Sequence, residues 1–409
     1  MAFALLLTSG LVETFATTDQ PSYARLDTFG PSVLGFHFRL RSRIDDDGVR
    51  LRGSRLISPS SYRTEILAGN AAIFGVSGWW DGAYARAAAQ RFNAAPTQGS
   101  QLLLGPWTHD GVWHIEQADR ATRSRFDHDR RLLHFFNEHL RGDTTGRSGE
   151  PPVRYFTIIE SKWKSAETWP PDAVCNRIFF LTAERQLTDQ PALQQQLLAY
   201  KQQPVGTGKR NRWSTQAELG GKVVYLDRRK LLNLMLTFRT KSLDRDCEVT
   251  GHAVVTLHVA CTDHDPVVLV YLEDVDPSGK VLMVTEGGLR ARYRRTLDDA
   301  TISSHMGLRQ LGIPARSFMR IDDAPIQPVT RGSEIVESRL AKLTFDLLPT
   351  SYVFRSGHRL QISIATTDVD QFPSARSHTL WIAVGQPLAS QIQVPIKHQH
   401  RAGNFCQIL

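Results

Sequence analysis

The sequence predicts an α/β fold followed by an all-β sandwich of jelly-roll type. Two short apolar runs, at residues 71–77 and 101–105, have the composition of strands buried on both faces, and an alanine-rich helix pattern lies between them. From about residue 177 onward, short runs of period-two alternation are separated by Gly, Pro and Asp turns. The change of character at residues 151–176 marks the junction between the two parts.

The first part alternates strands, loops and helices. The stretch DGAYARAAAQRFNAA favours a helix from about residue 83 to 93, because alanine and arginine have high helix propensity. After the strand at 101–105 come the loop PWTHDGVWH and the segment FDHDRRLLHFFNEHLRG, which predicts a second helix that ends at Gly142. This order predicts parallel strands joined by a crossover. The second helix has one apolar face, formed by Phe126, Leu133, Phe136 and Leu140.

The second part consists of many short strand patterns. HAVVTLHVA and KLTFDL each fit a strand with one buried face. Such strands, punctuated by turns, favour an antiparallel sandwich. The predicted strands lie in RIFFLTA, HAVVTLHVAC, DPVVLVYLEDV, KVLMVTEGGL, RLAKLTFDL, HRLQISIATTD and HTLWIAVG.

Composition and charge exclude several classes of protein. A chain of 409 residues is too long for one ordinary core, so two or more domains are expected. The net charge of +8 is scattered along the chain, so we expect no binding to nucleic acid. No apolar run approaches the length of a membrane span, and the start MAFALLLTSG lacks the basic residues that open a signal peptide. We therefore expect a cytoplasmic protein that does not bind membranes.

The cysteines and histidines do not predict a metal site. Cys175, Cys247, Cys261 and Cys406 are far apart and are expected to be free thiols, with a bridge between Cys247 and Cys261 left open. The histidines of the second helix are spaced six and five residues apart, which does not place ligands on one helix face. No phosphate-binding glycine loop is present, and no cofactor is expected.

Two polar residues follow the two buried strands and are the candidate catalytic residues. Asp81 follows the first strand and His109 the second. Functional residues of α/β folds gather beyond the carboxyl ends of the strands. A histidine that accepts and returns a proton needs a carboxylate to fix its tautomer, and the order Asp before His is that of α/β-hydrolases. The alternative is that Asp81 caps the following helix and that His109 is an ordinary loop residue.

These two segments resemble a known family. GWWDGAY followed by LLLGPWTHD is similar to the aspartate and histidine segments of the cocaine esterase-like hydrolases, which include X-prolyl dipeptidyl peptidases and α-amino-acid ester hydrolases. LLHFFNEHLRGD, PPVRYFTI, TDHDPVVLVYLEDVDPSGKVLMVTEGGL and SGHRLQISIATTDVDQFP resemble further segments of that family, so that the similarity covers roughly residues 65–385. The resemblance implies that Asp81 and His109 are the acid and the histidine of a catalytic triad.

The resemblance also implies a division of the chain. Residues 1–65 would be a remnant of a helical cap, and residues 66–150 the C-terminal part of an α/β-hydrolase domain. Residues 151–176 would form a linker and exit strand, and residues 177–409 a jelly-roll (galactose-binding-like) sandwich. The implied function is a serine hydrolase that acts on a small-molecule ester or an X-Pro peptide. Trp80 and Trp107 either contact the substrate or pack in the core beneath the two loops.

One departure from the family is serious. The family carries its nucleophilic serine in a G-x-S-x-G motif before the aspartate, and no such motif occurs in these 409 residues. Without a serine no acyl-enzyme can form, so the nucleophile is expected to lie outside this chain, as in a fragment or a split enzyme. The alternatives are a non-catalytic binding or assembly module based on the sandwich, and an inactive remnant. Self-association into a homo-oligomer stays open. An unpaired apolar edge at residues 71–77 predicts poor solubility.

Overall fold

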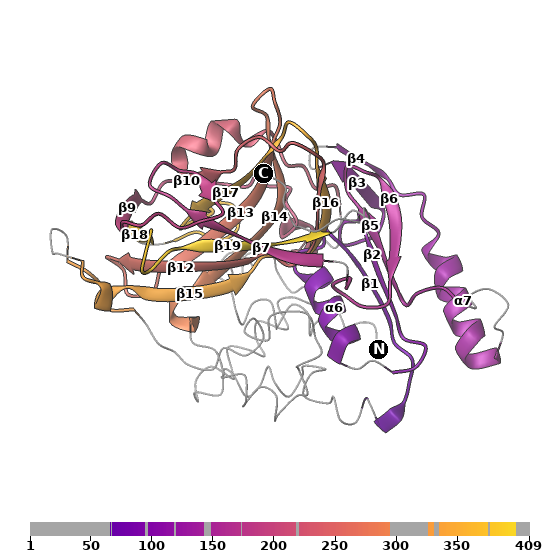
Figure 1. Ribbon diagram of the computed structural model, residues 1–409. Coiled ribbons are helices and arrows are strands. Elements are labelled where there is room, and N and C mark those ends of the chain that lie inside the picture. Colours follow the sequence, from indigo (N-terminus) through magenta and orange to yellow (C-terminus); the bar gives the residue numbers. More distant parts are fainter. Residues whose placement is uncertain are drawn as a thin grey trace.

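The computed structural model describes residues 66, 68–94, 97–117, 120–142, 149–172, 174–217, 221–294, 326–330, 335–374 and 377–397. The predicted remnant of a cap, at residues 1–65, lies outside these residues. In Figure 1 the described chain forms two parts, a small α/β layer and a larger β-sandwich beside it.

The α/β layer is built on a four-stranded sheet in the order β1-β2-β5-β6 (Figure 1). β1 (Phe74–Gly78) and β2 (Gln101–Gly105) are parallel, and so are β2 and β5 (Val153–Thr157), whereas β6 (Lys162–Ala166) runs antiparallel to β5. The predicted pair of parallel strands is therefore confirmed. A small hairpin follows β2 and consists of β3 (Trp113–Gln117) and β4 (Arg120–Arg123).

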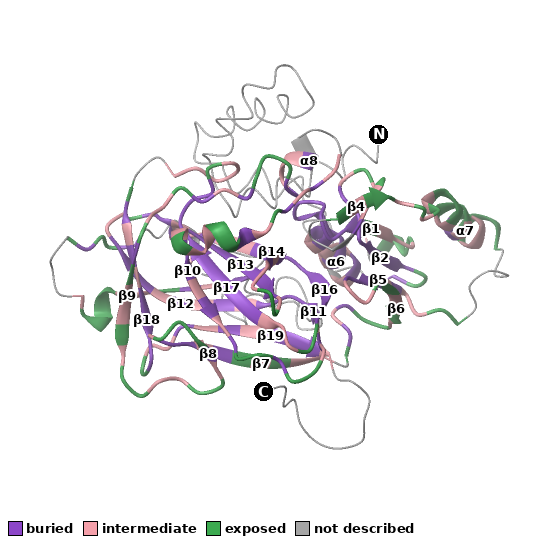
Figure 2. Ribbon diagram, turned by 90° about the horizontal axis from the view of Figure 1, so that it is seen from above, coloured by how far each residue is buried: buried purple, intermediate pink, exposed green. Residues whose placement is uncertain are grey.

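Two helices cover opposite faces of this sheet (Figure 2). Gly75 faces the carbonyl oxygen of Ala88 in α6 (Tyr84–Ala94), whereas the ring of Phe74 stacks on Phe135 of α7 (His128–Arg141) at 5.2 Å. Neighbouring residues of a strand point to opposite faces, so α6 and α7 lie on opposite sides of β1. A parallel sheet needs such cover on both faces.

Both ends of α7 follow from local chemistry. The carboxylate of Asp127 accepts a hydrogen bond from the backbone N–H of Arg130 and caps the helix at its start. Gly142 ends the helix in the left-handed conformation, with φ of 69°, as predicted. The predicted apolar face is wrong in part, because Phe126 precedes the helix and Leu133, Phe136 and Leu140 are largely exposed. Phe135 is the buried side chain of α7, while Leu133 and Leu140 are 60% and 77% exposed.

The sandwich consists of two sheets whose pairings are antiparallel. The smaller sheet has the order β10-β17-β13-β14, and the larger sheet contains nine described strands along the path β16-β11-β19-β12-β18-β9, with β15 on β12, β7 on β19 and β8 on β7. The strands of the two sheets together are β7 (Val174–Leu181), β8 (Leu187–Thr188), β9 (Gln196–Lys201), β10 (Leu236–Arg239), β11 (Cys247–Gly251), β12 (Val254–Cys261), β13 (Val267–Val275), β14 (Val281–Arg290), β15 (Ala341–Asp346), β16 (Thr350–Phe354), β17 (Arg359–Ala365), β18 (Thr379–Val384) and β19 (Gln391–Lys397). Its short helices are α8 (Ser214–Ala217), η3 (Arg228–Leu234), η4 (Ala291–Tyr293) and η7 (Glu337–Arg339).

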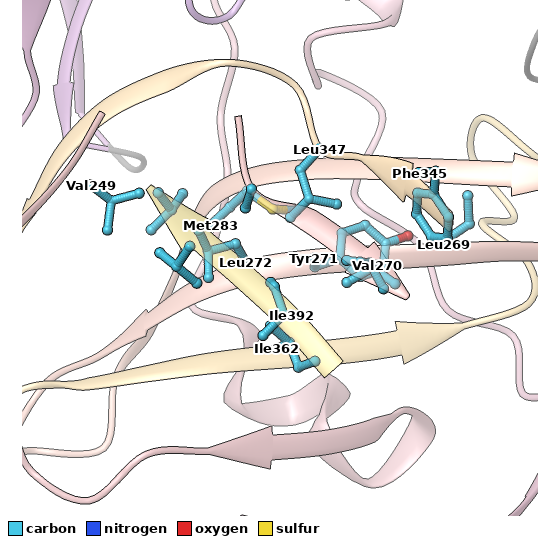
Figure 3. Close-up of a cluster of buried hydrophobic side chains, with 14 of the residues drawn as sticks. Val249, Leu269, Val270, Tyr271, Leu272, Met283, Phe345, Leu347, Ile362 and Ile392 are labelled. Atoms are coloured by element: carbon cyan, nitrogen blue, oxygen red, sulfur yellow. The ribbon is translucent and has the colours of Figure 1, made fainter. Parts of the chain in front are cut away.

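Each of the seven strand segments predicted for the second part contains a strand, and the all-β architecture is confirmed. The jelly-roll connectivity stays a prediction. β8, β9, β10, β11, β16 and β19 were not among the predicted strands. Side chains from both sheets fill the core between them (Figure 3). Among them are the fully buried Val249, Leu272, Met283, Ile362 and Ile392.

The two parts are joined by backbone pairing as well as by side chains. Ile158, just after β5, forms a parallel bridge with Tyr352 of β16, and its N–H donates to the carbonyl of Ser351 at 2.9 Å. The guanidinium of Arg86 in α6 lies 3.1 Å from the carboxylate of Asp346 at the end of β15. The α/β layer therefore rests directly on the larger sheet of the sandwich.

The prediction of free cysteines is correct for Cys247 and Cys261 and wrong for Cys175. The first two are free and buried, whereas Cys175 at the start of β7 forms a disulfide. Cys406 lies outside the described residues. A disulfide is a bond of oxidising environments, so the cytoplasmic location stays a prediction without support from the cysteines. Within the described part of the chain, no helix has the length and apolarity needed to cross a bilayer.

A buried ion pair joins the short helix η3 to the smaller sheet. The guanidinium of Arg228 in η3 lies 2.5 Å from the carboxylate of Glu273 on β13, and the two side chains are 3% and 0% exposed. The other carboxylate oxygen of Glu273 accepts hydrogen bonds from Gln361 and Ser363 of β17. Arg228 also lies over the ring of Tyr271, 4.4 Å from its centroid.

We predict that Arg228→Met lowers the free energy of unfolding by about 3 to 5 kcal/mol, because it leaves the carboxylate of Glu273 buried without its cation. Urea unfolding followed by circular dichroism measures this loss. Arg229→Met is the matched control, since Arg229 is the next residue along and its side chain is exposed, and it should leave the midpoint unchanged. Equal midpoints for the wild type and Arg228→Met would show that the pair contributes nothing.

Candidate active site

The candidate site forms where the chain continues past the ends of β1 and β2. The two segments stay paired beyond the strands, because the N–H of Trp79 donates to the carbonyl of Gly105 at 2.8 Å and the N–H of Trp80 to that of Trp107 at 3.0 Å. This pairing carries the first segment to Asp81 and the second to His109. Both residues thus reach the same edge of the sheet, as expected for parallel strands.

Close approach of the two segments explains the glycine that precedes the tryptophans. A Cβ atom on Gly78 would lie 2.0 Å from the carbonyl oxygen of Trp107, so no other residue fits there without moving the backbone. A Cβ on Gly105 would lie 2.2 Å from the ring of Trp107, so a larger residue there would displace that buried ring. The glycines of GWWDG and LGPWTH are therefore requirements of packing.

The structure brings Asp81 and His109 into direct contact. Nδ1 of His109 lies 2.8 Å from Oδ1 of Asp81, and the two side chains are 11% and 10% exposed. The second oxygen, Oδ2, accepts a hydrogen bond from the hydroxyl of Ser77 at 3.3 Å. An ionised carboxylate can only accept, so the pairing places a proton on Nδ1 and leaves Nε2 of a neutral imidazole as the basic nitrogen.

Burial and pairing set the protonation of this pair. Burial by itself lowers the pKa of His109, but the hydrogen bond and the charge of Asp81 outweigh it, so that the pKa of His109 is raised above its ordinary value. Burial raises the pKa of Asp81, and the hydrogen bonds from His109 and Ser77 oppose that rise. A histidine with a raised pKa and a fixed tautomer can take a proton and return it.

The alternative role of Asp81 as a helix cap is met in part by its backbone. The carbonyl oxygen of Asp81 accepts a hydrogen bond from the N–H of Tyr84 at the first turn of α6, at 2.8 Å. Its carboxylate is bonded to His109 and Ser77 instead. The residue therefore begins the helix with its main chain while its side chain reaches the histidine.

Two further residues that the sequence reasoning missed hold the histidine loop. The ring of Tyr84 stacks on the imidazole of His109, with centroids 5.3 Å apart and planes inclined by 29°. Asp110 accepts hydrogen bonds from the hydroxyl of Thr108 and the N–H of Val112, and a third from the N–H of Gly221 in the sandwich. Tyr84 follows Asp81 by three residues at the start of a helix, so its side chain could have been placed from the spacing. The contact with Gly221 has no signal in the sequence.

Trp80 and Trp107 are buried, at 0% and 1% exposure. The indole N–H of Trp107 donates to the hydroxyl of Ser124, and its ring contacts Phe126 and Trp163. In this structure both tryptophans pack against protein, which is the core-packing alternative. Their contact with a substrate stays a prediction.

The sandwich supports Trp80 from the other side. The guanidinium of Arg212 lies over its ring at 5.1 Å, and the ring of Tyr225 lies 5.3 Å away. Arg212 forms a buried ion pair with Glu286 of β14 at 3.2 Å. Trp80, the residue before Asp81, therefore packs against a side chain that is ion-paired with the smaller sheet.

Among the described residues, no group of three or more acidic, histidine or cysteine side chains is arranged to hold a metal ion. The site is built from a carboxylate, an imidazole and their supporting contacts.

Two segments of the chain match models of one family of hydrolases. Residues 145–380 match the model of the X-Pro dipeptidyl-peptidase C-terminal non-catalytic domain, and residues 56–111, which contain Asp81 and His109, match that of the X-Pro dipeptidyl-peptidase S15 family. The chain belongs to the X-Pro dipeptidyl-peptidase and cocaine-esterase-like family of hydrolases.

Curated relatives agree with this assignment. A protein of Mycobacterium tuberculosis whose name describes it as a serine esterase is 43% identical over 345 residues, which cover 83% of this chain and 52% of that protein. Cocaine esterase of a Rhodococcus species is 23% identical over 319 residues, which cover 72% of this chain and 48% of the esterase. The chain therefore spans about half the length of the curated relatives it matches.

A solved structure shows the same fold. An aminopeptidase from a marine sediment archaeon of the Thaumarchaeota matches with a TM-score of 0.66 over 92% of this chain and 62% of that one, at 16% sequence identity. Identity this low supports the fold alone, and it supports it across both the α/β layer and the sandwich.

We predict that Asp81→Asn lowers the pKa of His109, because the burial that lowers it remains while the charge that raises it is removed. Titration of the His109 ring protons by NMR measures the shift in the full chain. Asp110→Asn is the control, since Asp110 contributes the smallest of the interactions that raise the pKa and should lower it less. An unchanged pKa in Asp81→Asn would mean that the two side chains are not paired in solution.

Proposed function

We propose that this chain supplies the histidine and the aspartate of a Ser-His-Asp hydrolase that acts on acyl esters or X-Pro peptides. The observation that carries the proposal is the 2.8 Å contact between His109 Nδ1 and Asp81 Oδ1 at the carboxyl edge of a parallel sheet. His109 acts as general base through Nε2 and then as general acid, and Asp81 fixes its tautomer and stabilises the imidazolium. The names of the relatives, a serine esterase and a cocaine esterase, support this class of reaction.

The nucleophile is proposed to come from polypeptide outside these 409 residues. The sequence contains no G-x-S-x-G motif. Ser77, the serine nearest to Asp81 in the sequence, lies on β1, the strand that leads to Asp81. Its hydroxyl donates a hydrogen bond to Asp81 Oδ2. A serine placed beside Nε2 of His109 would transfer its proton there as it attacks the acyl carbon, and His109 would then return that proton to the leaving group.

A second candidate is a non-catalytic binding or assembly module. More than half of the chain matches a domain described as non-catalytic. In that case Asp81 and His109 would serve only to connect the loops, and their substitution would leave the biological activity in place.

The test uses a fusion in which the part of the M. tuberculosis relative that this chain does not match is joined to the full chain. We expect hydrolysis of a p-nitrophenyl ester or of an X-Pro p-nitroanilide by the fusion and negligible turnover by the chain alone. Asp81→Asn should reduce the turnover of the fusion by about 10⁴, because the histidine is then held in the wrong tautomer. His109→Ala should reduce it by a similar factor.

His264→Ala is the matched control, because this histidine also lies beside an aspartate, Asp263, but in the sandwich and 51% exposed. It should leave the turnover unchanged.

The rate of the fusion should also rise with pH through the pKa of His109, because the base acts in its neutral form. This pKa lies above the ordinary histidine value. A fusion that keeps full activity with His109→Ala would overturn the proposal and favour the binding module.

A further inference from the structure

The sandwich contacts the immediate sequence neighbours of the candidate catalytic pair. Trp80 precedes Asp81, and Asp110 follows His109. Contacts with the sandwich join Arg212 to Trp80, Asp346 to Arg86 of α6, and Gly221 to Asp110. The domain that this part of the chain matches is described as non-catalytic. Its side chains nevertheless reach the chain on either side of Asp81.

Arg212 is held in place by a turn and by an ion pair. The side-chain oxygen of the preceding residue, Asn211, accepts hydrogen bonds from the N–H groups of the two residues after Arg212, at 2.9 and 3.0 Å. The N–H of Arg212 itself donates to the hydroxyl of Tyr225 at 3.1 Å. Its guanidinium lies 3.2 Å from the carboxylate of Glu286 on β14, and the two side chains are 1% and 6% exposed. Both the main chain and the side chain of Arg212 therefore have fixed partners.

The indole of Trp80 lies against this guanidinium. Cζ of Arg212 is 5.1 Å from the centroid of the ring, a distance at which a cation is attracted by the π electrons. The main chain of Trp80 is held separately, because its N–H donates to the carbonyl of Trp107. Asp81 is the next residue, so a shift of Trp80 would displace the carboxylate that contacts His109.

We propose that Arg212 is a positioning residue for Asp81 and that it acts through the indole of Trp80. Through this contact the sandwich holds the acid within hydrogen-bonding distance of His109. The inference rests on the proposed function for its catalytic meaning, whereas the geometry that it concerns belongs to this chain alone. A misplacement of about 1 Å can cost roughly 100-fold in rate, so a contact of this kind matters for turnover.

The smaller sheet contains a second buried pair with the same chemistry. Arg228 pairs with Glu273 on β13 and lies over the ring of Tyr271, 4.4 Å from its centroid. Its aromatic partner belongs to the sandwich, whereas that of Arg212 belongs to the α/β layer. Loss of either pair should weaken the fold in a similar way, but loss of the Arg212 pair alone should reach Asp81.

The test removes both members of each pair, so that no charge is left buried without its partner. The interface variant carries Arg212→Gln with Glu286→Gln, and the sheet variant, its matched control, carries Arg228→Gln with Glu273→Gln. Each variant is made in the full chain, and urea unfolding followed by circular dichroism compares their stabilities.

We expect the pKa of His109, measured by NMR titration of its ring protons, to fall in the interface variant by less than it falls in Asp81→Asn. The hydrogen bond and the charge of Asp81 raise this pKa, and they weaken when the carboxylate is less well fixed. The sheet variant should leave the pKa unchanged. The interface variant loses one positive and one negative charge, so a fall reports on the contact with Asp81 rather than on a change in net charge.

In the fusion described above, the interface variant should lower kcat by about 10- to 100-fold and leave KM nearly unchanged, because the acid acts on the reaction rather than on substrate binding. The sheet variant should keep the kcat of the wild type. Arg212→Lys is a milder variant, since it keeps a cation beside Glu286 but lacks the planar guanidinium. It should lower both kcat and the pKa of His109 in the same direction.

An unchanged or raised pKa of His109 in the interface variant and in Arg212→Lys, or an equal fall in the interface and sheet variants, would overturn the inference. A raised KM with an unchanged kcat would also overturn it, in favour of a direct contact between Trp80 and the substrate. A wild-type fusion without activity would overturn the proposed function instead. In that case the titration of His109 in the chain alone would still decide whether Arg212 positions Asp81.

Discussion

The site depends on the backbone contact between the segments that follow β1 and β2. The N–H of Trp80 donates to the carbonyl of Trp107 at 3.0 Å, and the two segments lie closer together there than any side chain at position 78 would allow. Because this contact lies one residue before Asp81 and two before His109, small changes in it would move both side chains of the pair. The glycines and tryptophans of the two motifs thus serve one geometric purpose, which is to hold Asp81 beside His109.

Local pattern predicted the two parallel strands and the two helices of the α/β layer but not β3, β4 or β6, and the resemblance to the family was needed to choose Asp81 and His109 as a pair. Residues 101–105 form β2 with the predicted bounds, and the predicted helix at 83–93 is α6, displaced by one residue. The contact between Asp81 and His109 followed from the topology, because parallel strands end at one edge of a sheet. The catalytic role of that pair stays a proposal.

What the sequence could not show depends on contacts between distant residues. β9, β10, β11, β16 and β19 contain many polar residues, and their strand character comes from pairing with neighbours far along the chain, as in β19 between β7 and β12. The same applies to the support that the sandwich gives to the site through Arg212, Tyr225 and Gly221. The spacing of Leu133, Phe136 and Leu140 correctly indicated an apolar face of α7, but spacing does not show whether such a face is buried, and Phe126 precedes the helix.

These contacts also separate the positioning of the pair from the supply of the nucleophile. Ser77 and Tyr84 hold Asp81 and His109 from within the α/β layer, and Asp110 ties the histidine loop to the sandwich. All of these partners belong to the described part of this chain. The contacts that orient the imidazole are therefore supplied from within this chain. The α/β layer, with the loop that ties it to the sandwich, can hold an imidazole with a fixed tautomer and a raised pKa in place, so the proposed nucleophile would have only to bring a hydroxyl to Nε2.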